Sequence, residues 1–525
     1  MEKNYNDVKF ATCKDNHHNI IPMLDKKEIN GISKQTKTNA VNKVKGRIGE
    51  YYVESIIIDG KPKFLCVSNG NISQKDSIEH DGIIHRPLEA KACGYVPYNF
   101  SSFEFIELTS KEQNKEELLD QIKSKIDRYI SLREIDKNLI LGDVFLTYCL
   151  EWINTIHYPF FVGETESGKS TALHLAKLLC YRCHLGEDIP SADVYNFLGT
   201  DEEGTGTIAE DEAQELSRNF EKIRMYKSGY SMGSLKARII GVDNLGKLQV
   251  YYKTFCPKWF AGERTPQDKG FSERLAIIHM TEGQPVSNIK RISEQEKQEL
   301  AKLRNAMLMW KVQNISKGLT NIESGLTQRD QELWEDFLSI AHDTKYFDKF
   351  KNVVRYYVEQ RHNAIKNSLE AKLFKFVIVK LDSNLEVGFE DYWNYLTVNN
   401  TEFAGKLDER SNKTFYAEEY SEKITQYIIS KIFDNKFQAV KHVKVIRDQN
   451  KIQHQTTVYK FDRMTIITLS RKYGVEIPLD NPLYVGQQGK LGSQSVDHDD
   501  LVNQVSEERS SDNANKRDMG MDNKK

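Results

Sequence analysis

Residues 163–170 read Gly163-Glu164-Thr165-Glu166-Ser167-Gly168-Lys169-Ser170, which fits the pattern G-x-x-x-x-G-K-[ST]. The apolar run 158–162 before it predicts a buried strand, and residues 171–179 after it predict a helix. In that context the loop amides and the helix N-terminus form a site for phosphates. The sequence therefore predicts that the chain binds ATP. The expected contacts are Gly163, Glu164, Thr165, Glu166, Ser167, Gly168, Lys169, Ser170 and Thr171.

Two residues of this segment have specific expected roles. Lys169 would reach the β- and γ-phosphates of the nucleotide, and Ser170 would hold Mg²⁺. A chance match in a turn is the alternative, and the flanking strand and helix argue against it.

Three consecutive acids lie at the end of a second predicted strand. The run Gly206–Glu210 is strand-like and leads into Asp211 and Glu212, about 40 residues after the glycine-rich segment. Asp211 would hold the Mg²⁺, and Glu212 would act as general base toward the attacking water. Glu210 is a rival for either role, and a solvated acidic turn is the alternative for the whole run.

Composition limits the classes of function. The 525 residues allow three or four domains, and a net charge of -2 provides no general attraction for nucleic acid. No apolar run approaches the length of a membrane span, and the start of the chain lacks a signal-peptide pattern. The seven cysteines are scattered, which favours reduced thiols. We expect a cytoplasmic protein with no membrane association.

Changes in pattern along the chain predict an α/β protein in six parts. Residues 1–40 and 486–525 are polar and are expected to be disordered. Between them we expect a small β-rich N-terminal domain with a helix at 41–135, a nucleotide domain at 137–285, helices at 288–366 and a further domain at 367–475.

Several shorter elements are also predicted. Strands at 51–58 and 64–67 would form a hairpin, and 103–108 reads as a further β stretch. A helix is expected over 141–155. The run 180–184 matches a haem-attachment pattern but is interpreted as ordinary residues at a helix end.

Two further predicted strands make a family resemblance specific. One strand covers 254–262, and the other, 275–280, follows Ser272-Glu273-Arg274. Together with the glycine-rich loop and the acidic pair, this order resembles the P-loop NTPases of the AAA+ class. It is similar to their helicase clade, which includes superfamily 3 and minichromosome maintenance helicases and the helicase-like ATPases of archaeal, bacterial and mobile-element genomes. The resemblance covers about 140–285.

The resemblance implies roles for residues near the nucleotide. Arg274 matches the arginine finger, which acts on the nucleotide of a neighbouring subunit, so a homo-oligomer such as a hexameric ring is implied. An exposed arginine without that role is the alternative. The first sensor position falls on Glu263, where the family usually has Asn or Thr. A carboxylate cannot donate a hydrogen bond to phosphate, so Arg264 is an alternative sensor.

A predicted hairpin at 238–255 would contact nucleic acid. It lies where the helicase clade has a hairpin that points into the central pore. Lys247 lies at its tip, and Lys236 and Arg238 are supporting candidates for phosphate contact. An ordinary surface hairpin is the alternative.

The segment 367–475 resembles a winged helix domain, with three predicted helices before two strands. Residues 436–463 hold seven basic and two acidic residues, a local excess that favours binding to a phosphate backbone. A protein adaptor is the alternative. The candidate contacts are Lys441, Lys444, Arg447 and Lys451.

The sequence as a whole predicts an ATP-hydrolysing, DNA-dependent motor, a helicase or translocase of DNA replication or maintenance. An ATP-driven switch that remodels proteins or regulates transcription is the second hypothesis. A P-loop kinase is disfavoured, because phosphotransfer needs neither the acidic pair nor the arginine before the last strand.

Overall fold

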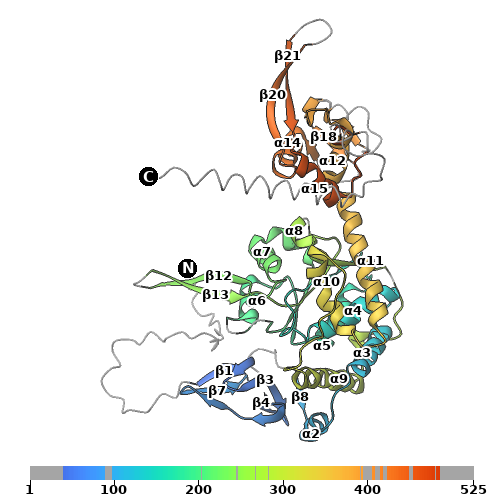
Figure 1. The fold of residues 1–525 in the computed structure, drawn as a ribbon. Helices are drawn as coiled ribbons and strands as arrows, with labels where there is room; N and C mark the ends of the chain where they lie inside the picture. The colour runs from blue at the N-terminus through green and yellow to red at the C-terminus, as the bar shows by residue number, and fades with distance from the viewer. Residues whose placement is uncertain are drawn as a thin grey trace, which may run out of the picture. The chain divides into compact units, whose positions relative to one another are not determined.

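The computed structural model divides the chain into two compact units, residues 1–359 and 360–525 (Figure 1). Both segments expected to be disordered lie outside the described residues, apart from Ala40. The structure describes residues 40–88, 97–200, 202, 204–243, 246–266, 268–281, 283–390, 392–393, 405–407, 414–417, 423–447, 453–478 and 481–484.

The first unit begins with a β-rich part, as predicted. Its larger sheet has the antiparallel order β2-β3-β4-β5, and β8 pairs with β3; a smaller sheet has the order β1-β7-β6. The predicted hairpin is confirmed, because Asp59 and Gly60 take the positive φ values that its two-residue turn requires. The strands are β1 (Ala40–Lys43), β2 (Lys45–Ile48), β3 (Tyr51–Ile58), β4 (Lys61–Ser68), β5 (Asn71–Lys75), β6 (Ile78–His80), β7 (Ile83–Pro87) and β8 (Asn99–Phe100).

The β stretch predicted at 103–108 is wrong, since α2 (Ser102–Ser110) is a helix. Ser101 caps it by accepting a hydrogen bond from the backbone N–H of Glu104. The alternating apolar pattern does not mark a two-faced strand, because Phe105 is buried whereas Phe103 and Ile106 are exposed.

A five-stranded parallel sheet forms the centre of the first unit, with the order β10-β11-β14-β9-β15. The chain leaves β9 toward the far edge at β10, whereas the connection from β14 passes to the other side of β9. Ligand sites in open parallel sheets form where such connections diverge, at the carboxyl ends of the strands. The strands are β9 (Tyr158–Val162), β10 (Cys183–Glu187), β11 (Thr207–Asp211), β14 (Lys258–Gly262) and β15 (Leu275–His279).

Strand β10 corrects the interpretation of 180–184 as the end of a helix. The helix α5 (Lys169–Leu179) stops before Cys180, and Cys183 and His184 belong to the edge strand of the sheet. The short elements between the strands are α6 (Ser191–Leu198), η1 (Ala213–Arg218), α7 (Phe220–Ser228) and α8 (Lys269–Ser272).

Helices pack with the central sheet into one hydrophobic core. The helix α9 begins at a capping box formed by Ser293 and Glu296. The helix predicted at 141–155 lies earlier, as α4, and turns follow it. None of the described helices is both long and apolar enough to cross a bilayer. The helical elements are α3 (Lys115–Tyr129), α4 (Glu134–Leu146), η2 (Ile289–Arg291), α9 (Glu294–Gln313), α10 (Gln328–Ala341) and α11 (Phe347–Lys366).

A buried ionic cluster ties the β-rich part to the central sheet and α9. Glu54 of β3 accepts hydrogen bonds from Arg182 at 2.7 Å and from Lys311 of α9 at 2.9 Å. Glu151 pairs with Lys45 at 2.8 Å and with Lys311 at 3.0 Å. Burial raises the pKa of Glu54, but Lys311, Arg182 and Lys45 outweigh it and lower the pKa to about 2.

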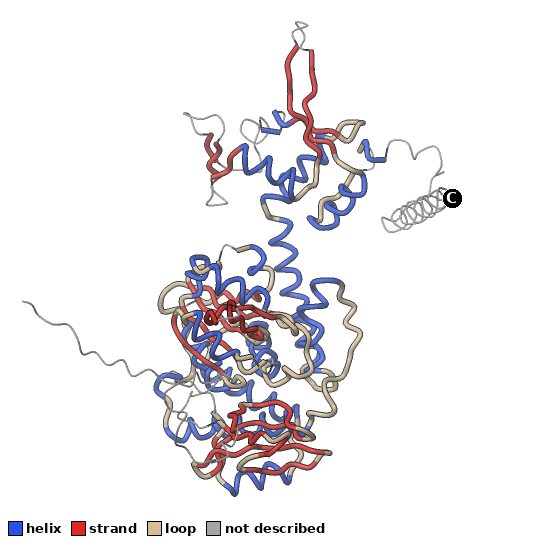
Figure 2. The backbone as a smooth tube through the Cα atoms, turned by 90° about the vertical axis from the view of Figure 1, so that its left-hand side faces the viewer, coloured by secondary structure: helices blue, strands red, loops and turns tan. Residues whose placement is uncertain are grey.

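The second unit combines helices with a three-stranded antiparallel sheet of order β16-β21-β20. Its long hairpin β20–β21 extends away from the helices of this unit (Figure 2). The helix predicted from 420 begins later, as α14. The elements are α12 (Leu369–Lys380), β16 (Glu386–Gly388), β17 (Gly405–Leu407), β18 (Thr414–Ala417), β19 (Lys423–Thr425), α14 (Gln426–Asn435), β20 (Val440–Arg447), β21 (Gln453–Lys460), α15 (Arg463–Tyr473) and η3 (Pro482–Tyr484).

Candidate nucleotide site

The glycine-rich loop, residues 163–170, leaves the carboxyl end of β9 and enters α5 directly. Gly168 caps α5 with a φ of 92°, a backbone conformation that favours glycine. A Cβ on Gly163 would lie 2.5 Å from the carbonyl oxygen of Met280 and 2.6 Å from Ser167 Oγ, so only glycine fits there. The Gly163 N–H donates to the carbonyl of Gly262 at 3.3 Å, which ties the loop to β14.

The structure brings Ser170 and Asp211 together. Ser170 Oγ donates to Asp211 Oδ2 at 2.7 Å, although the two residues are 41 positions apart. Lys169 Nζ lies over the loop and donates to the carbonyl oxygens of Gly163 and Glu164, each at 2.6 Å. The predicted phosphate-binding and magnesium-binding residues thus form one cluster.

The donor set fits a magnesium ion that also binds phosphate. Mg²⁺ prefers oxygen ligands, and in nucleotide sites it takes one or two from the protein and the rest from phosphates and water. The Ser170 hydroxyl and the Asp211 carboxylate supply two such oxygens. Among the described residues no group of three or more His, Cys, Asp or Glu could hold a metal ion.

The geometry separates Glu210 from its two neighbours. Glu210 is buried and accepts hydrogen bonds from Lys222 at 2.6 Å and from Tyr226 at 2.7 Å. Burial raises its pKa, opposed by Lys222. Glu212 is exposed and has a φ of 57°, a strained conformation for a side chain other than glycine. Of the two glutamates, Glu212 is the one open to solvent.

Gln214, on η1, contacts two elements of the site, and the sequence reasoning did not single it out. Its Nε2 donates to Glu212 Oε2, and its Oε1 accepts the backbone N–H of Glu263 at 3.2 Å. A Cβ on Gly262 would lie 2.4 Å from that Oε1, so the absence of a side chain there makes room for the amide. The only signal in the sequence was closeness to the acidic pair.

The tip of β14 lies beside the glycine-rich loop. Thr165 Oγ1 donates to Glu263 Oε1 at 3.5 Å, and Arg264 is exposed at the same tip. The residue at the expected sensor position is thus a carboxylate close to the loop.

Arg274 lies at the opposite end of the sheet. It precedes β15, whose register pairs Leu275 with Tyr158 and His279 with Val162. One strand length, about 17–20 Å at 3.3 Å per residue, therefore separates Arg274 from the loop of its own chain. Its guanidinium stacks 4.3 Å from the centre of the Tyr230 ring, and burial together with Arg329 lowers its pKa.

The predicted hairpin is confirmed as β12 (Leu235–Asp243) and β13 (Gly246–Lys253), which extend from the core (Figure 1). The Arg238 guanidinium stacks 4.9 Å from the centre of the Tyr195 ring on α6, and Lys236 lies on the same face. The opposite face exposes three large apolar side chains, Leu235, Ile239 and Tyr251, each 53–55% exposed, beside Gln249 and Lys253. The side chain of Lys247 lies outside the described part.

Basic residues of the second unit have mixed surroundings. Lys444 pairs with Glu386 of β16 at 3.1 Å, whereas Lys441 is exposed. Lys451 and the side chain of Arg447 lie outside the described part. The exposed face of α14 adds Tyr427, which Lys431 covers at 5.5 Å.

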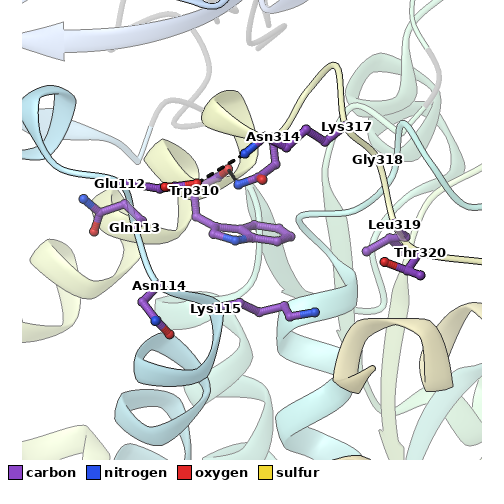
Figure 3. A pocket seen from close by; sticks show the side chains of 10 residues that line it. All are labelled: Glu112, Gln113, Asn114, Lys115, Trp310, Asn314, Lys317, Gly318, Leu319 and Thr320. Carbon is purple, nitrogen blue, oxygen red and sulfur yellow. Dashed lines mark hydrogen bonds and ion pairs between the residues drawn. The ribbon is translucent and has the colours of Figure 1, made fainter. Parts of the chain in front are cut away.

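A separate cavity of about 500 Å³ lies between the start of α3 and the end of α9 (Figure 3). The side chains of Trp310 and Lys115 line it, and Lys115 donates to the carbonyl of His342 at 2.9 Å. No residue of the glycine-rich loop contributes to this cavity, so it is distinct from the candidate nucleotide site.

Comparisons with known proteins give weak likenesses. No family model matches the chain, and no curated protein does. Three apo structures of the NrS-1 C-terminal region are similar at 13, 11 and 12% identity, with TM-scores of 0.28, 0.31 and 0.30. Each match covers 78% of this chain and 96% of the other. Likenesses this weak carry no argument about function, which rests on the site itself.

Proposed function

We propose that this protein is an AAA+-like P-loop ATPase that works as a DNA-dependent motor. The observation that carries the ATPase proposal is the 2.7 Å contact between Ser170 and Asp211 at the end of the glycine-rich loop. A hydroxyl beside the loop lysine and a carboxylate at the end of a second strand of the same sheet, here β11, are the pair that holds Mg²⁺ in P-loop NTPases.

Each residue near the loop has a defined task in this proposal. The loop amides and the start of α5 bind the phosphates. Lys169 exchanges its hydrogen bonds to the carbonyl oxygens of Gly163 and Glu164 for contacts with the phosphates. When bound, the Mg²⁺ neutralises charge that develops on the phosphate oxygens. Glu212 orients the attacking water and accepts its proton.

The DNA part of the proposal rests on the second unit. Its helix α12, strand β16, helix α14 and hairpin β20–β21 come in the order of a winged helix, with the small sheet β17–β18–β19 inserted before α14. The helix before the hairpin exposes Tyr427, Lys431 and Lys436, a combination that suits stacking and phosphate contact. A protein with such a DNA-binding unit would act in DNA replication or maintenance.

A protein-remodelling switch is the second candidate function. The exposed Leu235, Ile239 and Tyr251 on one face of β12–β13 favour contact with protein, and Arg238 on the other face already stacks on Tyr195. The glycine-rich loop would act in the same way in both candidates.

The purified protein should hydrolyse ATP, and single-stranded or duplex DNA should increase the rate. Lys169→Ala should lower kcat at least about 100-fold, because one preorganised cation at the phosphates is lost. Lys177→Ala, an exposed lysine on the same helix, is the matched control and should hydrolyse ATP like wild type. Unchanged hydrolysis by Lys169→Ala would refute the site, and hydrolysis indifferent to DNA would favour the switch.

Two inactive variants should restore activity when mixed. Arg274→Ala keeps an intact loop and Lys169→Ala keeps Arg274, so roughly a quarter of the interfaces in a random 1:1 assembly would be complete. Steady-state ATP hydrolysis by the mixture should therefore exceed the sum of the two separate rates. A mixture that only reaches that sum would show that Arg274 does not act between copies.

A further inference from the structure

Gln214 bridges the carboxyl ends of two neighbouring strands, β11 and β14, through its side-chain amide. The orientation of this amide is fixed by its partners, because the N–H of Glu263 needs an acceptor and the carboxylate of Glu212 needs a donor. The carbonyl oxygen therefore faces β14, and the NH₂ group faces Glu212.

We propose that Gln214 is a positioning residue that holds Glu212 in the orientation needed to activate the attacking water. This inference rests on the proposed function. The Gln214 side chain is anchored at the end of β14, where Gly262 leaves space for the amide. The carbonyl oxygen of Gly262 also accepts the N–H of Gly163 in the glycine-rich loop. The amide thereby links the general base to the strand that supports the glycine-rich loop.

The acidic surroundings of Glu212 explain why an amide, rather than another carboxylate, can hold its side chain. Asp211 and Glu263 flank the same site, and ionised carboxylates accept hydrogen bonds without donating them. An exposed glutamate among other acids would turn toward solvent unless a neutral donor held it. The Gln214 amide is such a neutral donor, because its nitrogen carries N–H groups and no charge.

Two variants of the full-length chain test the inference. Gln214→Ala removes the hydrogen bond and should lower kcat about 10–100-fold, because a misplaced catalytic group is costly in rate. Affinity for a fluorescent ATP analogue should stay unchanged, since the loop binds the phosphates. Gln214→Glu keeps the size but repels Glu212, so its kcat should also fall and should approach the wild-type value as the pH is lowered and the new carboxyl becomes a donor. Gln74→Ala, an exposed glutamine of β5, is the control.

The outcomes separate this inference from the proposed function. Wild-type protein that does not hydrolyse ATP would overturn both. An active wild type with a Gln214→Ala variant of equal kcat would overturn the inference alone. Parallel losses of kcat, nucleotide affinity and melting temperature in both variants, with no recovery of Gln214→Glu at lower pH, would show a merely structural role and would also overturn it.

Discussion

Glu212→Gln should bind ATP normally and hydrolyse it about 1,000-fold more slowly than wild type. The amide keeps the size of the side chain but cannot accept a proton from water. Binding should be retained because the phosphates contact the loop, whereas Glu212 lies exposed beyond β11. Single-turnover hydrolysis and binding of a fluorescent nucleotide measure the two quantities separately.

The neighbouring acids supply the comparison for this variant. Glu215→Gln changes a partly exposed acid of η1 that pairs with Arg218, and it should hydrolyse ATP at the wild-type rate. Glu210→Gln should lower stability instead, because it leaves Lys222 without its buried partner. A Glu212→Gln variant with wild-type kcat, beside a folded but inactive Glu210→Gln, would transfer the role of general base to Glu210.

Lys311→Met should lower the free energy of unfolding of the first unit by about 3–5 kcal/mol. The Lys311 side chain is fully buried, within 3.0 Å of both Glu54 and Glu151, and its Nζ lies 3.8 Å from the centre of the Tyr181 ring. Methionine keeps most of the volume but leaves two buried carboxylates with less compensation. Urea denaturation followed by tryptophan fluorescence measures the change.

Lys317→Met is the matched control, because Lys317 forms an exposed pair with Glu112 and exposed pairs contribute at most about 1 kcal/mol.

The loss of stability in Lys311→Met should also shrink under acid conditions. The wild-type pKa values of Glu54 and Glu151 are both about 2, below the usual range of glutamate. Their contribution to stability is full above about pH 4.5 and is lost as the pH falls toward 2. A pH-independent difference between wild type and variant would contradict this account.

Local patterns predicted the parts of the fold that local interactions determine. The glycine-rich loop, the hairpin turn at Asp59 and Gly60 and the hairpin β12–β13 all depend on neighbouring residues. The predictions of secondary structure failed where burial in the folded protein, rather than the local pattern, determines whether a segment is a helix or a strand. Residues 103–108 alternate like a strand, but the Ser101 cap and the burial of Phe105 alone favour a helix. Strand β10 is a partly buried edge strand whose sequence has no alternation.

The candidate site shows the same limit. The acidic pair could be found by its spacing, but Gln214 could not, because its partner Glu263 belongs to a strand end 49 residues away. Counting charges in 436–463 likewise missed Glu386, which strand pairing brings beside His442 and Lys444. A short window of the sequence contains only one of the two residues that form such a contact.

The position of Arg274, one strand length from its own glycine-rich loop, has a consequence for enzyme kinetics. If each catalytic site is completed by another copy, specific activity depends on the total concentration of the protein. Dilution below the dissociation constant of the assembly would then leave chains that hold ATP without turning it over. The amount of the protein made in a cell would in this way set a threshold for ATP consumption, with no inhibitor required.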